Sequence, residues 1–152
     1  LTRYTGGTEV SAGLTIYTQI GTTATTVACS YTNEAGTAGR VSPLVAIGGT
    51  GFREASRFLL LPMAAGDLGV RSVESVTVTA TTGTAGAFGV TLFKPLMSFH
   101  IERIGEQKTF NFIDGGMQGG LPEVLANACL CWLYFPAGTS VALSGALTIS
   151  ED

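Results

Sequence analysis

The sequence carries little charge. Only 12% of its 152 residues are Asp, Glu, Lys or Arg, and the net charge is −3. Soluble globular domains usually carry about 25% charged residues, so Thr, Ser, Gly and Ala take the place of much of the usual surface charge. A mildly acidic chain has no broad electrostatic attraction to nucleic acid or to an anionic membrane. We therefore expect neither of them to be a partner.

Long apolar runs are also missing, and cysteine is scarce. No run approaches the ~18 apolar residues of a membrane-spanning helix, and no signal peptide is visible. The three cysteines are an odd number and do not suggest a disulfide framework. Cys129 and Cys131 lie in an apolar run, so we interpret them as small buried hydrophobic residues. The chain begins with Leu1 rather than Met, which fits a processed form or part of a longer polypeptide.

Groups that could carry out catalysis or bind a metal are few. The only histidine, His100, would share a strand face with Glu102, but a lone histidine on a strand is usually a packing or surface residue. The glycine-rich segments match neither the dinucleotide fingerprint nor the P-loop. Asp67 and Asp114 are isolated, so the sequence contains no calcium loop, and no zinc site is supported. We expect no catalytic residues, no cofactor and no metal, and therefore not an enzyme.

Apolar and polar residues alternate with a period of two along most of the chain, which is typical of β-strands. The 21 threonines add to this, because β-branched residues favour strands over helices. Regularly spaced short strands with Gly, Pro and Asn turns indicate a single-domain antiparallel β-sandwich over residues 1–152, jelly-roll-like, with nine or ten strands. We expect one helical turn over 121–126, and strands at 14–20, 26–32, 40–47, 58–61, 70–82, 88–93, 97–102, 109–113, 129–135 and 140–149.

Two details of these strands can be tested. Pro43 indicates an edge strand or a bulge within 40–47, because proline cannot donate to a ladder. In the strand over 70–82, strict alternation places Val70, Val76 and Val78 on one face. The same alternation places Val73 on the other face, with the polar residues.

One short segment concentrates charge and an aromatic ring in a chain that has little of either. Phe52, Arg53 and Arg57 fall within six residues, and Arg71 lies on the polar face of the 70–82 strand. One interpretation is a contact with another subunit or a scaffold, in which arginine is the usual bidentate anchor. The other is a solvated loop with an internal salt bridge.

The low charge itself has two interpretations. Thr and Ser cost far less to desolvate than Lys or Glu, and charged residues are depleted at interface cores. We therefore expect much of the exterior to be covered in use by sister subunits or a larger scaffold. The alternative is a neutral, Thr-rich β-domain that is simply soluble.

Four segments within residues 1–100 carry a resemblance to a known group of proteins. They are SYTNEAGTAGR (30–40), GGTGFREA (48–55), GVRSVESV (69–76) and TGTAGAFGV (82–90). Together they resemble virion structural proteins of tailed bacteriophages. The resemblance implies a head-associated or other particle component made in the bacterial cytoplasm and located in the virion. It carries over no functional residues.

The residues and the resemblance agree on a structural role. We expect a capsid decoration or cement protein that stabilises the shell through buried area and edge-strand pairing at repeated contacts. Its partners would be its own copies, as a homo-oligomer with a trimer favoured, and the major capsid protein or another virion protein. The alternative is a host- or glycan-binding fibre or tail β-module. That module would gather exposed aromatic residues in one groove, namely Tyr4, Tyr17, Tyr31 and Trp132.

Overall fold

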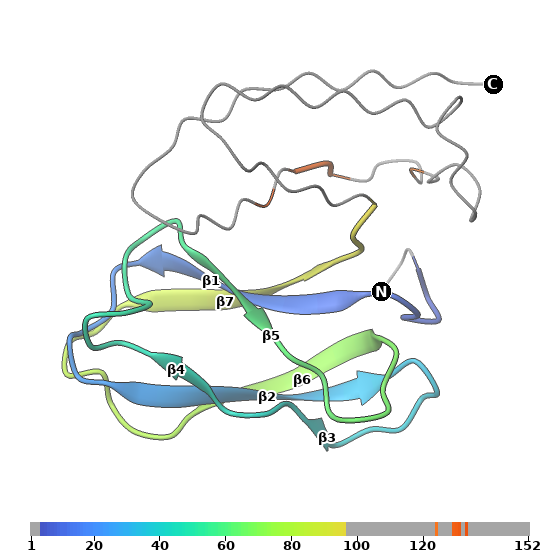
Figure 1. The fold of residues 1–152 in the computed structure, drawn as a ribbon, viewed down its shortest axis with the longest axis horizontal. Helices are drawn as coiled ribbons and strands as arrows, with labels where there is room; N and C mark the ends of the chain where they lie inside the picture. The colour runs from blue at the N-terminus through green and yellow to red at the C-terminus, as the bar shows by residue number, and fades with distance from the viewer. Residues whose placement is uncertain (1–3, 97–123, 125–128, 132, 134–152) are drawn as a thin grey trace, which may run out of the picture.

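The structure is a computed structural model of the chain, and it describes residues 4–96, 124, 129–131 and 133. These residues form seven β-strands and contain no helix (Figure 1). The prediction of an all-β chain is confirmed for this part of the molecule. In chain order the strands are β1 (Ser11–Thr18), β2 (Thr25–Asn33), β3 (Arg40–Val41), β4 (Val45–Ile47), β5 (Phe58–Leu61), β6 (Val70–Val78) and β7 (Ala87–Phe93).

Several predicted elements are not covered by this description. The strands expected at 97–102, 109–113 and 140–149 lie outside the described residues, and so does the helical turn over 121–126 except for residue 124, which is not helical. Three residues discussed in the sequence analysis also lie outside the described residues: His100, Glu102 and Asp114.

The prediction for the cysteines near position 130 was wrong. Residues 129–131 and 133, the described part of the strand expected over 129–135, belong to no strand. Cys129 and Cys131 are exposed there, whereas Cys29 on β2 is buried. An apolar run buries its residues only when it packs on a neighbour, and local sequence does not specify that neighbour.

The strands form two antiparallel sheets. One sheet has the order β5-β1-β7, with Leu14 of β1 opposite Leu59 of β5 on one side and Val90 of β7 on the other. In the second sheet β2 is central, with β6 along one edge and β3 and β4 following each other along the opposite edge. The two sheets lie one above the other in Figure 1, with β1 and β2 as their central strands.

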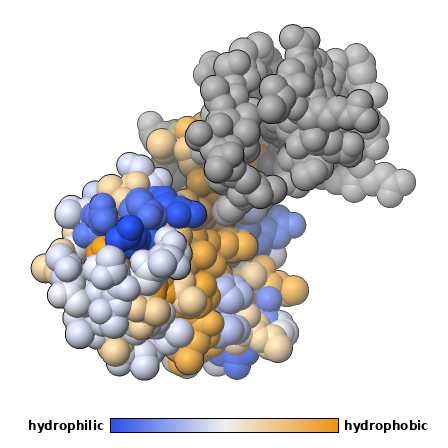
Figure 2. All heavy atoms as spheres, turned by 60° about the vertical axis from the view of Figure 1, so that its left-hand side comes forward, coloured by the Kyte–Doolittle hydropathy of each residue, from blue (hydrophilic) through white to orange (hydrophobic). Residues whose placement is uncertain are grey.

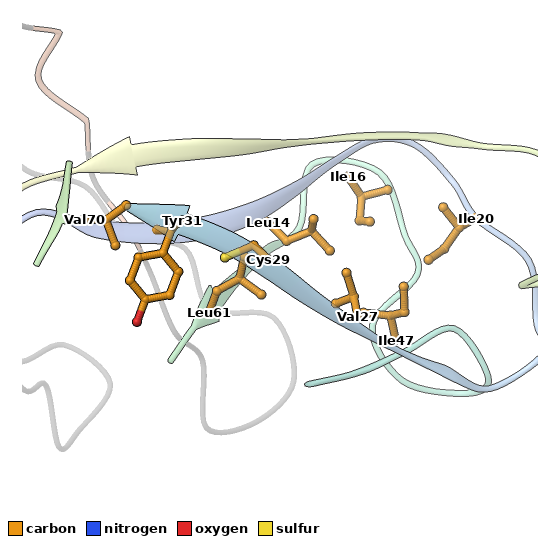
Figure 3. Close-up of a cluster of buried hydrophobic side chains, with 10 residues drawn as sticks. Leu14, Ile16, Ile20, Val27, Cys29, Tyr31, Ile47, Leu61 and Val70 are labelled. Atoms are coloured by element: carbon orange, nitrogen blue, oxygen red, sulfur yellow. The ribbon is translucent and has the colours of Figure 1, made fainter. Parts of the chain in front are cut away.

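The core lies between the two sheets (Figure 3). Alternate residues of the central strands point into it, including Leu14 and Ile16 from β1 and Val27 and Tyr31 from β2, each at most 1% exposed. This period of two is the one expected for half-buried strands. Burying each such side chain contributes about 1.5–3 kcal/mol. The cluster also contains Ala12, Ile20, Cys29, Ile47, Leu61 and Val70.

Pro43 interrupts the strand predicted over 40–47 and separates β3 from β4. Ser42, the residue before the proline, still pairs with Cys29 of β2. Its Oγ accepts a hydrogen bond from the backbone N of Cys29, and its own N donates to the Cys29 carbonyl, both at 2.9 Å. Ser42 is buried despite being polar, because these groups are satisfied. The proline therefore sits at a break in the edge of the sheet, as its lack of an N–H predicts.

Two β-bulges change which side chains of β6 face the core. The pairing with β2 skips Glu74 and Arg71, so each is an extra residue in β6. An extra residue reverses the alternation beyond it. Val73 therefore packs against the core, and the prediction that it lies on the polar face was wrong. β6 also ends at Val78, earlier than residue 82.

Leu14 gives a direct test of the core. We expect Leu14→Ala to lower the free energy of unfolding by about 2–5 kcal/mol, because it leaves a cavity between two sheets. Leu60→Ala is the matched control, since Leu60 lies on the outer face of β5 and is 46% exposed. It should cost no more than about 1 kcal/mol. Urea unfolding measures both, and equal losses would contradict this placement of the core.

Candidate functional site

The predicted contact residues Phe52, Arg53 and Arg57 lie on a loop, residues 48–57, that joins β4 to β5. The backbone of this loop is fixed to β1 and the residues after it. The Arg53 carbonyl accepts a hydrogen bond from Ile20 N, and the Arg57 carbonyl accepts one from Ile16 N, each at 3.0 Å. Phe52 packs against the core cluster. The backbone of the loop is therefore held against the rest of the fold.

Within this loop the three charges pair with one another. Arg57 Nη1 lies 2.9 Å from Glu54 Oε2, and Arg53 Nε lies 3.4 Å from Glu54 Oε1. Arg53 Nε is buried, and it donates no hydrogen bond to any acceptor in the described part of the chain. The Arg57 guanidinium lies 5.7 Å from the centre of the Phe52 ring, within cation–π range. An internal salt bridge is thus present, and the contact role of the loop stays a prediction.

Arg71 does not join this loop. It lies on β6, where its Nη2 donates to the Glu34 carbonyl at 3.2 Å. Loop 48–57 follows β4, which pairs with the start of β2, whereas Arg71 lies beside the end of β2. The four predicted contact residues therefore belong to two separate places on the surface.

The most extensive polar cluster centres on Asp67, for which the sequence pattern predicts no role. Its carboxylate accepts hydrogen bonds from Tyr31 Oη at 2.7 Å, Asn33 Nδ2 at 2.9 Å and Arg40 Nε at 2.9 Å. Tyr31 Oη in turn accepts a hydrogen bond from Ala64 N at 2.7 Å. The Asp67 side chain is only 4% exposed. A charge that is so poorly hydrated needs these donors to remain ionised.

The cluster ties the connection between β5 and β6 to the second sheet. Tyr31 and Asn33 come from β2 and Arg40 from β3, while Asp67 lies on the connecting segment 62–69. The bond with Arg40, followed by those with Tyr31 and Asn33, lowers the pKa of Asp67 to about 2. The arrangement is structural, because every polar partner named here is already paired within the chain.

The burial of Tyr31 also bears on the alternative function. Tyr31 is in the core, so it cannot contribute to an exposed aromatic groove. Tyr17 is 60% exposed, and the ring of Tyr4 lies 5.2 Å from Lys94 Nζ. Trp132 lies outside the described residues. The prediction that these four aromatic residues form one exposed groove is therefore wrong for Tyr31.

The outer face of the β5-β1-β7 sheet carries no charge. None of the residues in these three strands is Asp, Glu, Lys or Arg. The Phe58 ring leans over Gly13 of β1 and meets the Phe93 ring edge to face, with 5.3 Å between ring centres. Tyr17 lies over Gly89 of β7 in the same manner. A Cβ atom at either glycine would collide with the ring above it, so the glycines allow the rings to lie close to the sheet.

The outer face of the other sheet is polar. Glu74 accepts hydrogen bonds from the hydroxyls of Ser30 at 2.9 Å and Thr32 at 2.8 Å. The Thr26 and Thr79 hydroxyls lie 2.7 Å apart in a further hydrogen bond. The hydrogen bonds that Glu74 accepts lower the pKa of its carboxyl group, first that from Thr32, then that from Gly39 N and then that from Ser30. In the described part of the chain, one sheet therefore has a polar outer face, and the strands of the other sheet carry no charge.

No protein-family model matches the chain, and neither does any curated protein or solved structure. Among the residues that the structure describes, no group of three His, Cys, Asp or Glu side chains could hold a metal ion. The described part of the chain also contains no helix with the length and hydropathy to span a bilayer. In the described part of the chain, the charge-free face and loop 48–57 are the two surfaces whose composition suits a partner.

The Asp67 cluster predicts a specific dependence on pH. Because the pKa of Asp67 is about 2 in the folded protein against an ordinary 3.8, its ionised form stabilises the fold at neutral pH. That stabilisation is lost as the pH falls from about 4 toward 2. We expect Asp67→Asn to lower the midpoint of thermal unfolding at neutral pH and to flatten its decline over the acid range. Calorimetry at successive pH values measures this.

Tyr31→Phe is the companion variant for the same cluster. It keeps the carboxylate but removes one donor to it and the acceptor for Ala64 N. We expect it to lower the free energy of unfolding by about 1–3 kcal/mol and to retain part of the acid dependence. Acid profiles that are the same in the wild type and in Asp67→Asn would contradict the role given to Asp67.

Proposed function

We propose that the protein is a structural component of a bacteriophage particle, foremost a capsid decoration or cement protein. In this proposal it attaches to the major capsid protein or another virion protein as a homo-oligomer, with a trimer favoured. It stabilises the shell through many repeated contacts and acts without catalytic residues or a cofactor. The two sheets belong to a jelly-roll-like β-sandwich, which extends as one domain over residues 1–152 with nine or ten strands.

The charge-free outer face of the β5-β1-β7 sheet carries this proposal. A sheet face left in water normally carries charged side chains, as β6 does with Glu74 and Arg71. Here the outward positions hold aromatic rings, glycines and paired hydroxyls, with Thr15 Oγ1 and Thr91 Oγ1 3.3 Å apart. Such a face loses little hydration when a partner covers it. Among the described residues, the charges next to this face stand at its borders, where Arg57 precedes β5 and Lys94 follows β7, as in the polar rim of an interface.

The size of the face favours a contact that is weak on its own and repeated. β1 has eight residues, and at about 3.4 Å per residue and 5 Å between strands the three strands cover roughly 300–400 Å². A stable one-to-one interface buries about 800 Å² on each partner. A single copy therefore binds weakly through this face. Copies joined to one another and to a repeating lattice bind far more tightly.

A host- or glycan-binding fibre or tail module is the second candidate. Tyr17 favours it, because the ring is fixed over Gly89 and remains 60% exposed, so that an apolar ligand surface can stack on it. The two functions use the same face and are separated by their ligands. A decoration protein binds shells and ignores soluble glycans, whereas a glycan-binding module does the reverse.

Charge placed on the face tests the first candidate. We expect Thr91→Lys to weaken binding to capsid shells at least about tenfold, because the partner would have to bury an unpaired ammonium group. Thr77→Lys is the matched control, since Thr77 is exposed on the outer face of the other sheet. Co-sedimentation with shells that lack the protein measures both variants. Equal binding by both variants would remove this face from the contact.

Loop 48–57 is tested separately. If its arginines anchor the partner, Arg53→Glu and Arg57→Glu should each weaken shell binding about tenfold or more and leave the unfolding midpoint nearly unchanged. Glu54→Gln controls for the internal ion pairs, because it removes the shared carboxylate but keeps both arginines. Normal incorporation of both arginine variants would assign the loop to internal pairing alone.

A further inference from the structure

We propose that β3 and the two residues before it, residues 38–41, form a pH-sensitive strap that acid releases from the edge of β2 while the two sheets stay folded. The inference is independent of the proposed function, because it involves neither the charge-free face nor loop 48–57. It is carried by the shortness of β3, by two carboxylates that hold the strap from the two sides of the sheet, and by the uncharged contacts around it.

β3 is too short to hold itself firmly on the sheet. It has only two residues, and its pairing with β2 reaches only Ser30 and Tyr31. Strands usually have about five or six residues, so this pairing alone holds the segment weakly. Pro43 follows directly and interrupts the edge, because it has no N–H to donate. β4 lies beyond Pro43 and pairs separately with residues 25–27 of β2. β3 can therefore leave the edge while β4 stays on it.

Glu74 holds the strap from the outer side of the sheet. Gly39 N donates to its carboxylate, at 3.1 Å from Oε1 and 3.3 Å from Oε2. The same carboxylate accepts hydrogen bonds from the Ser30 and Thr32 hydroxyls, so the Glu74 side chain reaches from β6 across the outer face of β2. All of these donors are uncharged. The charge of the carboxylate is therefore what makes the bonds to it strong.

Asp67 holds the next residue of the strap from the inner side. Arg40 Nε donates to Asp67 Oδ2 at 2.9 Å. Tyr31 is the other titratable group at this carboxylate, and it donates its hydroxyl hydrogen. The charge of Glu34 also favours the charged form of Arg40, and Arg71 donates to the Glu34 carbonyl. Adjacent residues of the strap are thus held by two separate carboxylates.

Both carboxylates hold the strap best while they are ionised. Their hydrogen bonds, foremost those from Arg40 and from Thr32, lower the pKa of Asp67 to about 2 and lower the pKa of Glu74. A carboxylate of this kind stabilises its contacts above its ordinary pKa, and the stabilisation is lost as the pH falls through the lowered value. For Asp67 this loss extends from 3.8 toward about 2. The same fall in pH therefore weakens both attachments.

The two ends of the strap are fastened without carboxylates. Thr37 N donates to Asn33 Oδ1 at 2.8 Å, and Asn33 N donates back to the Thr37 carbonyl at 3.0 Å. At the other end, Ser42 N donates to the Cys29 carbonyl at 2.9 Å. None of these donors and acceptors gains a proton in mild acid. The released piece is therefore limited to residues 38–41.

The turn at the opposite end of the sandwich, residues 79–86, is also held without carboxylates. Figure 2 brings this end toward the viewer and shows a band of hydrophobic side chains beside a compact hydrophilic patch. Thr82 anchors the turn, because its carbonyl accepts a hydrogen bond from Thr23 N at 3.0 Å and its Oγ1 accepts one from Gly21 N at 3.2 Å. Acid therefore leaves this turn in place while it loosens the strap.

Release of the strap changes the edge of β2. With β3 in place, Ser30 and Tyr31 are paired on this side of the strand. Once β3 leaves, their backbone groups on this side have no other partner within the described chain. An unpaired edge can accept another strand. The strap therefore keeps this edge closed at neutral pH and opens it in acid.

Hydrogen exchange of single amides, followed by NMR on the full chain as the pH falls from about 6 to about 2.5, tests the strap. We expect the protection of Gly39 N, corrected for intrinsic exchange at each pH, to fall about tenfold or more, because this amide loses a bond to a charged acceptor. Ser42 N and Thr23 N bond to carbonyls, so their protection should change by less than about threefold.

Glu74→Gln is the decisive variant, because it keeps the size of the side chain and an acceptor oxygen but removes the charge. It should lower the protection of Gly39 N at neutral pH about tenfold and remove most of its dependence on pH. Glu54→Gln is the matched control, since it removes a surface carboxylate whose ion pairs lie within loop 48–57. It should leave Gly39 N as in the wild type, and unfolding midpoints confirm that both variants fold.

Three results would overturn the inference. The first is an equal loss of protection at Gly39, Ser42 and Thr23, which shows that the whole fold opens at once. The second is protection of Gly39 N that does not depend on pH in the wild type. The third is a dependence on pH that Glu74→Gln leaves unchanged. None of these results bears on shell binding, so the proposed function stands or falls separately.

Discussion

The carboxylate of Asp67, with its three donors, fixes the segment by which the chain passes from β5 of one sheet to β6 of the other. The chain leaves one sheet at β5 and enters the other at β6, and segment 62–69 makes that crossing. A single carboxylate with three donors joins the crossing to β2 and β3. The same segment also positions two neighbouring groups. Ala64 N donates a hydrogen bond to Tyr31 Oη, and Leu68 points outward. The chain has few charged residues. One carboxylate with all its hydrogen bonds satisfied therefore contributes much of the polar interaction that defines this fold.

The two outer faces show how the scarce charge is distributed. β6 concentrates its charge on its two bulge residues, Arg71 and Glu74, which also interrupt regular pairing. Bulges and charges are devices that keep an edge strand from pairing with another chain. On the other sheet, strands β1, β5 and β7 carry no charge, and two glycines let aromatic rings lie close to the backbone. The described strands thus protect one edge and place no charge on the β5-β1-β7 face, which favours a contact through that face over strand addition.

The sequence predicts strands well where each strand has one buried side. The alternation in β1, β2, β5 and β7 fits this condition, and the predicted ranges overlap the observed strands. Prediction from alternation fails at β6, because a bulge reverses the alternation without any change in composition. Val73 therefore faces the core. Prediction also fails for Asp67, whose partners lie 27 to 36 positions away in the chain. Arg53 and Arg57 are recognisable as a pair from local charge, but Arg71 is separated from them by the length of β2.

In the proposed role as a particle component, low surface charge and solubility before assembly place opposite demands on the chain. A surface made apolar enough for strong pairwise contacts would aggregate before reaching its lattice. Hydroxyl-rich strands avoid that outcome, because threonine is polar enough to stay hydrated and still cheap to desolvate. The surface that the described strands offer to such a partner is small, a face of roughly 300–400 Å². Small contacts of this kind become effective only when they act together on one ordered array. An assembly built from them gains its stability from repetition rather than from any single interface.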